Sequence, residues 1–427
     1  MSLDPNNPLE FVEWRSRYSS FWDDGSYLSD EAWSEFPPRR LFGQYTSSVM
    51  RSLLEEADNA SLIGRRVRSI SEVAGCNKFV VHYDCGVSEL FDKVILCVGH
   101  LPASPLFGAD RTRYYPSPYI DNCIPERALV GIIGSRLTAI DAVLALKETG
   151  HAGNVVMASR SGKLPKVIDP QRPPYDSGAF LKCLLADPGI SVESLIELHR
   201  MEIERVAGGS DALRKQALDP ITDAVSLRAT LDGLGKGNDW QSVLLASYSV
   251  VDKLWRTLND SDKAVFLQQY YGLWMTYLAA FPATSARRLL DEMEQGRLSL
   301  SGELVKIEPT DHGFDLIKKD GSKQFVEYLI DGRGVGYGYD ELNRDPLFGA
   351  LLQQGLVDIH PHGGLKVNRT TYEAIGSGGR VTQNFHVIGD LTKGEFLATT
   401  DVGRCVAHSV LLADAIVQQR SSGLSSR

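Results

Sequence analysis

The sequence predicts an α/β protein in which helices cover sheets of parallel strands. Three observations favour this fold class. The stretch "VGIIGSRLTAIDAVLAL", residues 130–146, runs from an apolar strand through a tight turn into a helix. The strand at residues 94–98 is almost wholly apolar, as is typical of strands buried on both faces of a parallel sheet. A succession of short strands that ends in an apolar strand also occurs twice in the chain.

Composition narrows the class of protein. The chain has 427 residues, enough for two or three domains, and its 43% hydrophobic and 23% charged content is ordinary for a soluble globular protein. A net charge of −9 disfavours nucleic acid and anionic lipid as main partners, because both would be repelled. No apolar run is long enough to span a bilayer, and the polar start "MSLDPNNPLEF" lacks the features of a targeting peptide. We therefore expect a cytoplasmic protein.

Cysteine and histidine spacing argues against metal or thiol chemistry. The six cysteines are scattered without a C-x-x-C pair, which suits a reducing compartment and disfavours a thioredoxin-like pair or a zinc knuckle. His360 and His362 in "DIHPHGG" have no acidic residue or third histidine at useful spacing, so we expect them to line a turn and expect no metal site. The sequence also contains no G-x-S-x-G, Walker-type or H-E-x-x-H motif.

The order of expected elements follows from hydrophobic spacing. The first forty residues look irregular, and a helix is expected over 41–57. Residues 61–100 and 296–334 each read as several strands closing on an apolar strand, so we interpret them as a repeat of architecture. Residues 177–295 have helical spacing; their aromatic side chains fit a helical core better than the wall of a substrate pocket. Residues 384–419 read as a buried strand, a Gly-Asp turn, a loop and a helix from about Val402.

The turn in residues 130–146 has part of the pattern of a dinucleotide-binding turn. Such a turn needs a glycine for the bend, a second glycine for close approach to pyrophosphate, and a small third residue where helix meets strand. Gly134 and Ala139 supply the first and third, but Arg136 stands at the second. Its side chain obstructs the closest approach, although a guanidinium can bind phosphate in a bidentate way. The alternative is an ordinary βαβ unit with a tight turn.

The strand after this turn indicates which dinucleotide would bind. "NVVMASR" ends at Ser159 and Arg160 instead of at the acidic residue that would bind the ribose 2′-hydroxyl of NAD. With Lys163 nearby, this strand end favours the 2′-phosphate of NADP. The alternative is that these basic residues are simply solvated.

Several motifs stand in the order of a known family: "PPRRLFGQY", "DKVILCVGH", "IIGSRLTAIDAVLALKETGH", "ASRSGKLPK", "FGALLQQGLVDIHPHGGLKVNRTT" and "HVIGDLTKGEFLATTDVG". Through them the chain resembles the bacterial FAD-NAD(P)-binding family, flavoproteins with two dinucleotide-binding domains. The resemblance implies two Rossmann-like domains, for FAD and NAD(P), with a helical insertion. The expected boundaries are 1–124 for the remaining N-terminal part of the FAD domain, 125–176 for the NAD(P)-binding half, 177–296 for the helical insertion, 297–345 for the return strands of the NAD(P) domain, and 346–427 for the C-terminal part of the FAD domain.

The resemblance also implies roles for single residues. Asp390 would bond the ribityl hydroxyls of FAD, Thr399 and Thr400 would face the flavin pyrimidine, and Arg160 would bind the 2′-phosphate of NADP. No catalytic residue is implied. The full set of expected cofactor-binding residues is Gly99, His100, Gly134, Ser135, Arg136, Leu137, Thr138, Arg160, Gly389, Asp390, Thr399 and Thr400. For His100, the alternatives are a proton shuttle and a ring that satisfies a backbone carbonyl.

In the resembled family an FAD-binding strand, glycine turn and helix precede everything seen here. We therefore expect this N-terminal βα segment of the FAD domain, about thirty residues, to be missing. The strands at Val94 and Phe385 would then lack a shared neighbour. We expect such a chain to bind FAD weakly or not at all and to aggregate through open strand edges.

The leading functional hypothesis is an FAD- and NADPH-dependent oxidoreductase acting on a small-molecule substrate. NADPH would reduce FAD, and the flavin would pass electrons to oxygen or an organic acceptor. The absence of a cysteine pair disfavours disulfide reduction, and an N-hydroxylating or related monooxygenase is the sharper version of the hypothesis. The rival is a non-catalytic, degenerate nucleotide-binding protein that serves as a sensor or scaffold, marked by Arg136 and the absent FAD turn.

Overall fold

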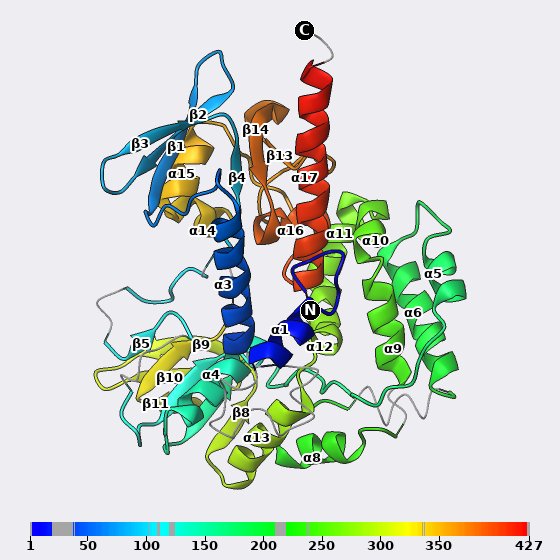
Figure 1. Ribbon diagram of the computed structural model, residues 1–427. Coiled ribbons are helices and arrows are strands. Elements are labelled where there is room, and N and C mark those ends of the chain that lie inside the picture. The colour runs from blue at the N-terminus through cyan, green and yellow to red at the C-terminus, as the bar shows by residue number, and fades with distance from the viewer. Residues whose placement is uncertain are drawn as a thin grey trace. The chain divides into compact units, whose positions relative to one another are not determined.

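The structure, a computed structural model, describes residues 2–18, 37, 39–101, 103–108, 112–118, 124–209, 219–236, 239–334, 336 and 338–424. The chain forms two compact units (Figure 1). The first unit comprises Met1–Leu101 and Gly336–Arg427, and the second unit comprises Pro102–Val335. The second unit is thus inserted into the first, and residues 102–124 fall within it. Cys123 and residues 19–36 of the N-terminal stretch lie outside the described residues.

The first unit contains a three-stranded sheet of order β13-β14-β4, formed by Glu373–Ile375, Val381–Val387 and Val94–Leu96. β4 and β14 pair in parallel, with Phe385 opposite Val94 and Val387 opposite Leu96. The expectation that the strands at Val94 and Phe385 lack a shared neighbour is therefore wrong: they bond to each other directly. β13 pairs with β14 on its other side, so there is no gap beside β14. The expectation failed because it placed another strand between two strands that are adjacent.

A separate antiparallel sheet, of order β1-β2-β3, and several helices complete the first unit. Phe79 of β2 packs edge to face on Phe385 of β14, with ring centroids 5.2 Å apart, so both sheets share one core. The predicted helices near residues 41–57 and after Val402 are confirmed as α3 and α17, whereas α1 shows that the N-terminal stretch is not wholly irregular. The elements are α1 Glu10–Tyr18, α3 Arg39–Glu56, β1 Val67–Val73, β2 Lys78–Tyr83, β3 Ser88–Phe91, α14 Tyr339–Arg344, α15 Pro346–Gln353, η4 Ser377–Gly379, η5 Gly389–Thr392, α16 Lys393–Phe396 and α17 Val402–Leu424.

The second unit is built on a five-stranded parallel sheet of order β5-β12-β6-β7-β8. Both faces of its central strands are covered: Ile132 of β6 belongs to the core on the side of helix α4, and the next residue, Ile133, belongs to the core on the opposite side. This two-sided burial explains why these strands show no polar alternation. The strands and the helix are β5 Tyr114–Tyr115, β6 Val130–Ile133, α4 Leu137–Glu148, β7 Val155–Ala158, β8 Leu298–Ser301 and β12 Tyr328–Asp331.

The predicted repeat of architecture is confirmed. In the second unit β9 Leu304–Pro309, β10 Phe314–Lys318 and β11 Lys323–Val326 form an antiparallel sheet of order β11-β10-β9, and the following β12 joins the parallel sheet. The first unit does the same with β1, β2 and β3, followed by β4. In each copy, a three-stranded antiparallel sheet leads into a strand that pairs in parallel with a neighbour: β4 with β14 in the first unit, and β12 with β5 and β6 in the second.

The helical reading of residues 177–295 is also confirmed for the described part of that segment, coloured mainly green in Figure 1. Its aromatic side chains divide between two environments. Trp240 and Trp255 are buried core residues, as expected, but no side chain of α12 is buried. Among the described residues no helix combines the length and the apolar character that a membrane span requires. The helices are α5 Gly178–Leu184, α6 Val192–Val206, α8 Ala224–Asp232, α9 Asp239–Tyr248, α10 Val251–Thr257, α11 Asp260–Val265, the π-helix η3 Phe266–Tyr270, α12 Tyr271–Leu278 and α13 Ala283–Glu294.

Candidate functional site

The turn after β6 requires glycine at residue 134. Gly134 adopts φ +105°, a conformation that side-chain-bearing residues rarely take. A Cβ atom there would lie 2.8 Å from the carbonyl oxygen of Gly332, which follows the neighbouring strand β12. The Gly134 N–H donates to the carbonyl oxygen of Ala158 at the end of β7, at 2.7 Å. Gly134 therefore lies where the C-terminal ends of three adjacent parallel strands come close together, with no room for a side chain.

Small residues also let α4 approach the sheet. Ala139 is fully buried, and a Cβ atom on Gly332 would lie only 3.1 Å from the Ala139 Cα. Leu137 packs at the margin of the core on the same side, so its side chain contributes to packing. Arg136 is the N-cap of α4 and makes no side-chain cap bond. The first turn of α4, which includes Thr138, therefore leaves backbone N–H groups available at the end of the helix that favours anions.

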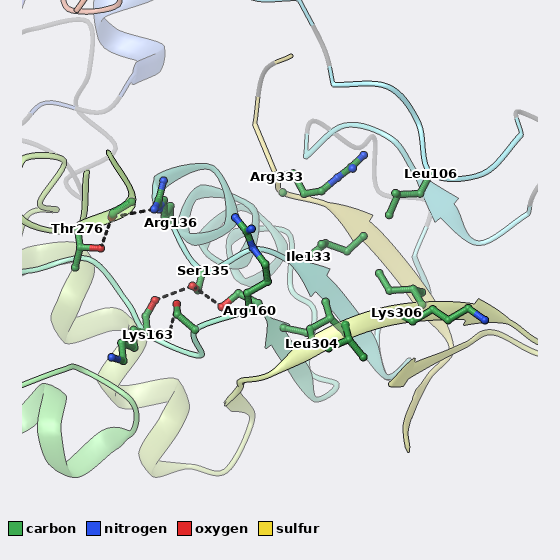
Figure 2. Close-up of a pocket in the computed structure, with 18 of the residues that line it drawn as sticks. Leu106, Ile133, Ser135, Arg136, Arg160, Lys163, Thr276, Leu304, Lys306 and Arg333 are labelled. Atoms are coloured by element: carbon green, nitrogen blue, oxygen red, sulfur yellow. Dashed lines mark hydrogen bonds between the residues drawn. The ribbon is translucent and has the colours of Figure 1, made fainter. Parts of the chain in front are cut away.

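A cavity of about 1030 Å³ opens beside this turn, wholly within the second unit (Figure 2). The turn, the C-terminal end of β7, strand β9, helix α12 and the segment after β12 contribute its wall. Ligands of open parallel sheets bind at this C-terminal edge of the strands. The residues that line the cavity include Leu106, Phe107, Gly134, Ser135, Arg136, Ser159, Arg160, Lys163, Gly272, Thr276, Lys306, Gly332 and Arg333.

The cavity wall carries several positively charged side chains, some of which form ion pairs with carboxylates and some of which do not. Arg333 is paired with Asp331 at 2.7 Å, and Lys306 with Glu308 at 2.6 Å. In the described part of the chain, the side chains of Arg160 and Lys163 form no ion pair. Figure 2 shows Arg160 extending from the end of β7 on the same side of the turn as Arg136, whereas Lys163 extends away from it beyond Ser135. Arg160 is thus the cation best placed to bind an anion here.

Arg136 reaches from the turn to the helical segment. Its Nη2 donates to the carbonyl oxygen of Gly272 in α12 at 3.0 Å. Desolvation lowers the pKa of this guanidinium, and the positive charge of Arg160 acts in the same direction. An anion in the cavity would relieve this repulsion between the two arginines.

Ser135 shapes the loop after β7. It is buried, its hydroxyl donates to the carbonyl oxygen of Lys163 at 2.7 Å, and it lies 3.0 Å from the Ser159 hydroxyl (Figure 2). The Ser159 hydroxyl in turn accepts from the N–H of Gly162 at 3.0 Å. Ser135 therefore orders residues 159–163, the loop that carries Arg160.

In the first unit, a second group of expected residues meets at the ends of β4 and β14. Asp390 is buried and bonds to His100 Nδ1, 290 positions away in the sequence. Its other oxygen accepts from the Thr399 hydroxyl at 3.1 Å. His100 Nδ1 therefore bonds a carboxylate; a backbone carbonyl as its partner was one of the two alternatives that the sequence left open. Because a carboxylate only accepts, Nδ1 carries the proton.

Two glycines leave open space around this His100–Asp390–Thr399 set. Gly99 and Gly389 adopt φ +70° and +77°, and a Cβ atom on either would meet no other atom of the structure within 4 Å. Thr399 is buried, whereas Thr400 is exposed. The Asp401 carboxylate that follows accepts from the Arg404 N–H at 3.0 Å, at the start of α17. Thr400 is thus an exposed residue two positions before the start of α17.

The His100–Asp390 pair predicts a specific pH dependence. The hydrogen bond and charge of Asp390 raise the pKa of His100 above 6.5, against the opposing effects of burial and of Arg39 and Lys393. A raised pKa in the folded state stabilises the fold fully below pH 6.5, and this contribution is lost as pH rises through the raised value. We expect Asp390→Asn to return the His100 pKa towards 6.5 in an NMR titration.

The matched control for this prediction is Asp92→Asn, which removes an exposed carboxylate paired with Lys78 in the same unit. The control should leave the His100 titration unchanged. An unshifted His100 pKa in the Asp390→Asn protein would contradict the assignment of Asp390 as its partner.

Sequence reasoning missed several residues at both sites. Lys306 and Arg333 line the cavity from β9 and from the segment after β12, which no local motif connects with the Gly134 turn. In the first unit, Glu395 lies within 3.2 Å of His360 and also bonds Arg369. His360 thus has an acidic neighbour that spacing along the chain did not suggest. The "DIHPHGG" motif was the available signal, but its partner is set by the fold.

Comparison with known proteins supports the resemblance. Residues 1–101 match the model of the FAD-NAD(P)-binding family. The uncharacterized protein YdhS of Escherichia coli (strain K12) is 23% identical over 354 residues, which cover 70% of this chain and 66% of YdhS. The chain thus matches slightly less than two thirds of the length of this relative. The predicted resemblance to the FAD-NAD(P)-binding family is therefore supported by a match over residues 1–101.

Solved structures show the same fold at low sequence identity. The ornithine hydroxylase PvdA from Pseudomonas aeruginosa superposes with a TM-score of 0.54 and 13% identity, over 97% of this chain and 83% of PvdA. The ornithine N-hydroxylase KtzI of Kutzneria sp. 744 was solved with reduced FAD, NADP+ and L-ornithine. It superposes with a TM-score of 0.55 and 14% identity, over 97% of this chain and 83% of KtzI. The predicted α/β fold with two Rossmann-like domains is thereby confirmed.

Proposed function

We propose that this chain is an FAD- and NADPH-dependent oxidoreductase of the flavin monooxygenase type, acting on a small-molecule substrate. The observation that carries the proposal is the cation-lined cavity at the Gly134 turn, at the C-terminal edge of a parallel sheet. The match of residues 1–101 to the FAD-NAD(P)-binding family supports the same conclusion. PvdA and KtzI are ornithine hydroxylases by name, and an N-hydroxylating activity is the specific form of the proposal.

The second unit suits NADPH. The cavity of about 1030 Å³ is ample for a nucleotide. The turn of Gly134, Ser135 and Arg136 and the start of α4 would hold the pyrophosphate, because the helix N-terminus supplies N–H groups and partial positive charge. Arg160, without an ion-pair partner in the described part of the chain, would bind the 2′-phosphate. None of the described residues that line the cavity is acidic, so none of them would favour the 2′-hydroxyl of NAD instead.

The first unit suits part of FAD. Asp390 would bind the ribityl hydroxyls, and the space beside Gly99 and Gly389 would admit the chain that carries them. Thr400 and the start of α17 would face the flavin pyrimidine, where N–H groups stabilise negative charge. His100 would keep its Nδ1 proton in the hydrogen bond to Asp390. The burial of Asp390 and the exposure of Thr400 agree with these roles.

The two cofactors supply hydride transfer and oxygen chemistry when bound, and the protein supplies binding and orientation. Arg160 selects the phosphorylated nucleotide, and Ser135 orders its loop. Asp390 and Thr399 fix the position of His100, whose imidazole carries the additional proton at a higher pH than a solvated histidine. Exposed free cysteines such as Cys76 and Cys85 support a reducing, cytoplasmic location.

NADPH oxidation tests the proposal. The purified 427-residue protein, supplied with excess FAD, is expected to oxidise NADPH at a rate that is lost when FAD is omitted, measured as the fall of absorbance at about 340 nm under air. NADH should be oxidised more slowly at equal concentration. The absence of FAD-dependent turnover, with NADPH binding retained, would contradict the oxidoreductase and support the alternative below.

The alternative is a non-catalytic NADP-binding protein. Arg136 favours it, because a side chain occupies the position at which a glycine allows the closest approach to pyrophosphate, and its guanidinium is bound to Gly272. Replacing Arg136 with glycine discriminates between the two. In an enzyme that uses Arg136 on phosphate, the change should weaken NADPH binding; in a degenerate site it should strengthen it.

A further inference from the structure

A buried charged cluster in the first unit has no role in the function proposed so far. It consists of Glu395 in α16 and of His360 and Arg369, both on the segment that precedes β13. Glu395 is only 7% exposed. One of its oxygens bonds Arg369 Nε, and the other lies 3.2 Å from His360 Nε2. Burying a carboxylate this deeply destabilises the fold through lost hydration, unless well-placed partners offset that loss.

The histidine is oriented for this contact by its own turn. His360 Nδ1 accepts from the His362 N–H at 3.1 Å, so the proton resides on Nε2, which faces Glu395. The turn packs tightly against α16: a Cβ atom on Gly394 would overlap both His360 Nδ1 and the Gly363 carbonyl oxygen. Gly394 thus lets the helix approach closely enough for the adjacent Glu395 to reach its two partners.

The position of Glu395 connects this cluster to the candidate flavin site. Asp390 precedes it by five residues and Thr399 follows it by four, and these two are joined by a hydrogen bond of 3.1 Å. Between them Leu397 adopts φ +53°, which is unusual for a residue with a branched side chain. A strained backbone of this kind persists only where surrounding contacts hold it. Glu395, two residues before Leu397, is the charged residue nearest to Leu397 in the sequence, and it is held by Arg369 and His360.

We propose that Glu395 is a positioning residue, which, held by Arg369 and His360, fixes the segment from Asp390 to Thr399 in the form that receives the ribityl chain of FAD. The inference rests on the proposed function for its ligand. The cluster itself does not touch that ligand; it acts through the Asp390–Thr399 bond. His360 and His362, which spacing assigned to a turn, gain a function in this arrangement.

The test compares the wild-type protein with Glu395→Gln, which keeps the shape and removes the charge. Amide hydrogen exchange without FAD should rise at least about tenfold in residues 393–400 and stay unchanged in β6, β7 and α4. The FAD dissociation constant, from quenching of flavin fluorescence, should rise about tenfold, and the NADPH affinity should not change. Glu395→Asp should restore part of the FAD affinity.

The matched control is Asp358→Asn, which removes the half-exposed ion pair of 2.6 Å between Asp358 and Lys366 in the same turn without touching Glu395. It should leave both exchange and FAD affinity unchanged. If Glu395→Gln fails to fold, Arg369→Met removes one partner from the half-exposed side of the cluster and should give the same two changes.

Failure of this inference and failure of the proposed function give different results. A wild-type protein that binds no FAD would overturn the proposed function and the flavin part of this inference, while the exchange measurement would still report whether Glu395 orders residues 393–400. A wild-type protein that binds FAD, with Glu395→Gln binding it equally well, would overturn this inference alone.

Discussion

Replacing Arg160 with glutamate is expected to weaken NADPH binding by roughly 10- to 100-fold and to leave NADH binding nearly unchanged. A hydrogen bond between charged groups contributes about 1.5–3 kcal/mol, and each 1.4 kcal/mol corresponds to about tenfold in affinity. Arg160 lines the cavity and has no ion-pair partner in the described structure, so the variant would lose the proposed contact with the 2′-phosphate and gain repulsion. Titrations with both nucleotides, followed by nucleotide fluorescence, measure the change.

The control for charge is Lys182→Glu, on the exposed face of α5 in the same unit and away from the cavity. It alters the net charge equally but should change neither affinity by more than about twofold, since exposed charges are screened by salt. An equal loss of NADPH and NADH affinity in Arg160→Glu would show that Arg160 contacts a part shared by both nucleotides. That outcome would contradict its assignment to the 2′-phosphate.

Replacing Gly134 with alanine is expected to destabilise the second unit by about 3 kcal/mol and to abolish NADPH binding at micromolar concentration. An alanine at φ +105° is strained by roughly 1–2 kcal/mol. Its Cβ would in addition lie 2.8 Å from the Gly332 carbonyl oxygen, which forces the ends of β6 and β12 apart. Urea unfolding, monitored by tryptophan fluorescence, measures the loss.

Gly150→Ala is the matched control for backbone strain. Gly150 also has a positive φ, +89°, but a Cβ atom there would meet no other atom of the structure within 4 Å. It should cost only the strain, about 1–2 kcal/mol, and should leave NADPH affinity intact. If the two variants were equally destabilised and both still bound NADPH, the close approach at Gly134 would not be what the turn requires.

Local sequence was a good guide to the second unit's turn. The strand, the glycine and the helix of residues 130–146 are adjacent in the chain, so hydrophobic spacing and one glycine were sufficient to predict them. The same holds for the basic end of β7 at Arg160. Of the residues expected at this turn, Gly134, Ser135 and Arg136 line the cavity, whereas Leu137 packs its side chain against the core and, like Thr138, is not among the described lining residues.

Local sequence was a poor guide to side chains that meet across the chain. His100 and Asp390 both carried expected roles, but their direct bond spans 290 positions and was not predicted. The parallel pairing of β4 with β14, which brings them together, was wrongly expected to need a strand between them. Register between distant parallel strands depends on the packing of the whole sheet, which periodicity along one strand does not encode.

The sequence by itself determined the α/β class, the repeated strand groups and the glycine turn, and its motifs indicated a resemblance to the FAD-NAD(P)-binding family whose model residues 1–101 match, because each depends on residues close together in the chain. Only the tertiary structure decided that Arg136 bonds Gly272, that His100 bonds Asp390, and that Glu395 is held by His360 and Arg369. The physical reason is that hydrogen bonds and ion pairs act over a few ångströms in space. Which distant residues come that close is set by the packing of complete helices and sheets.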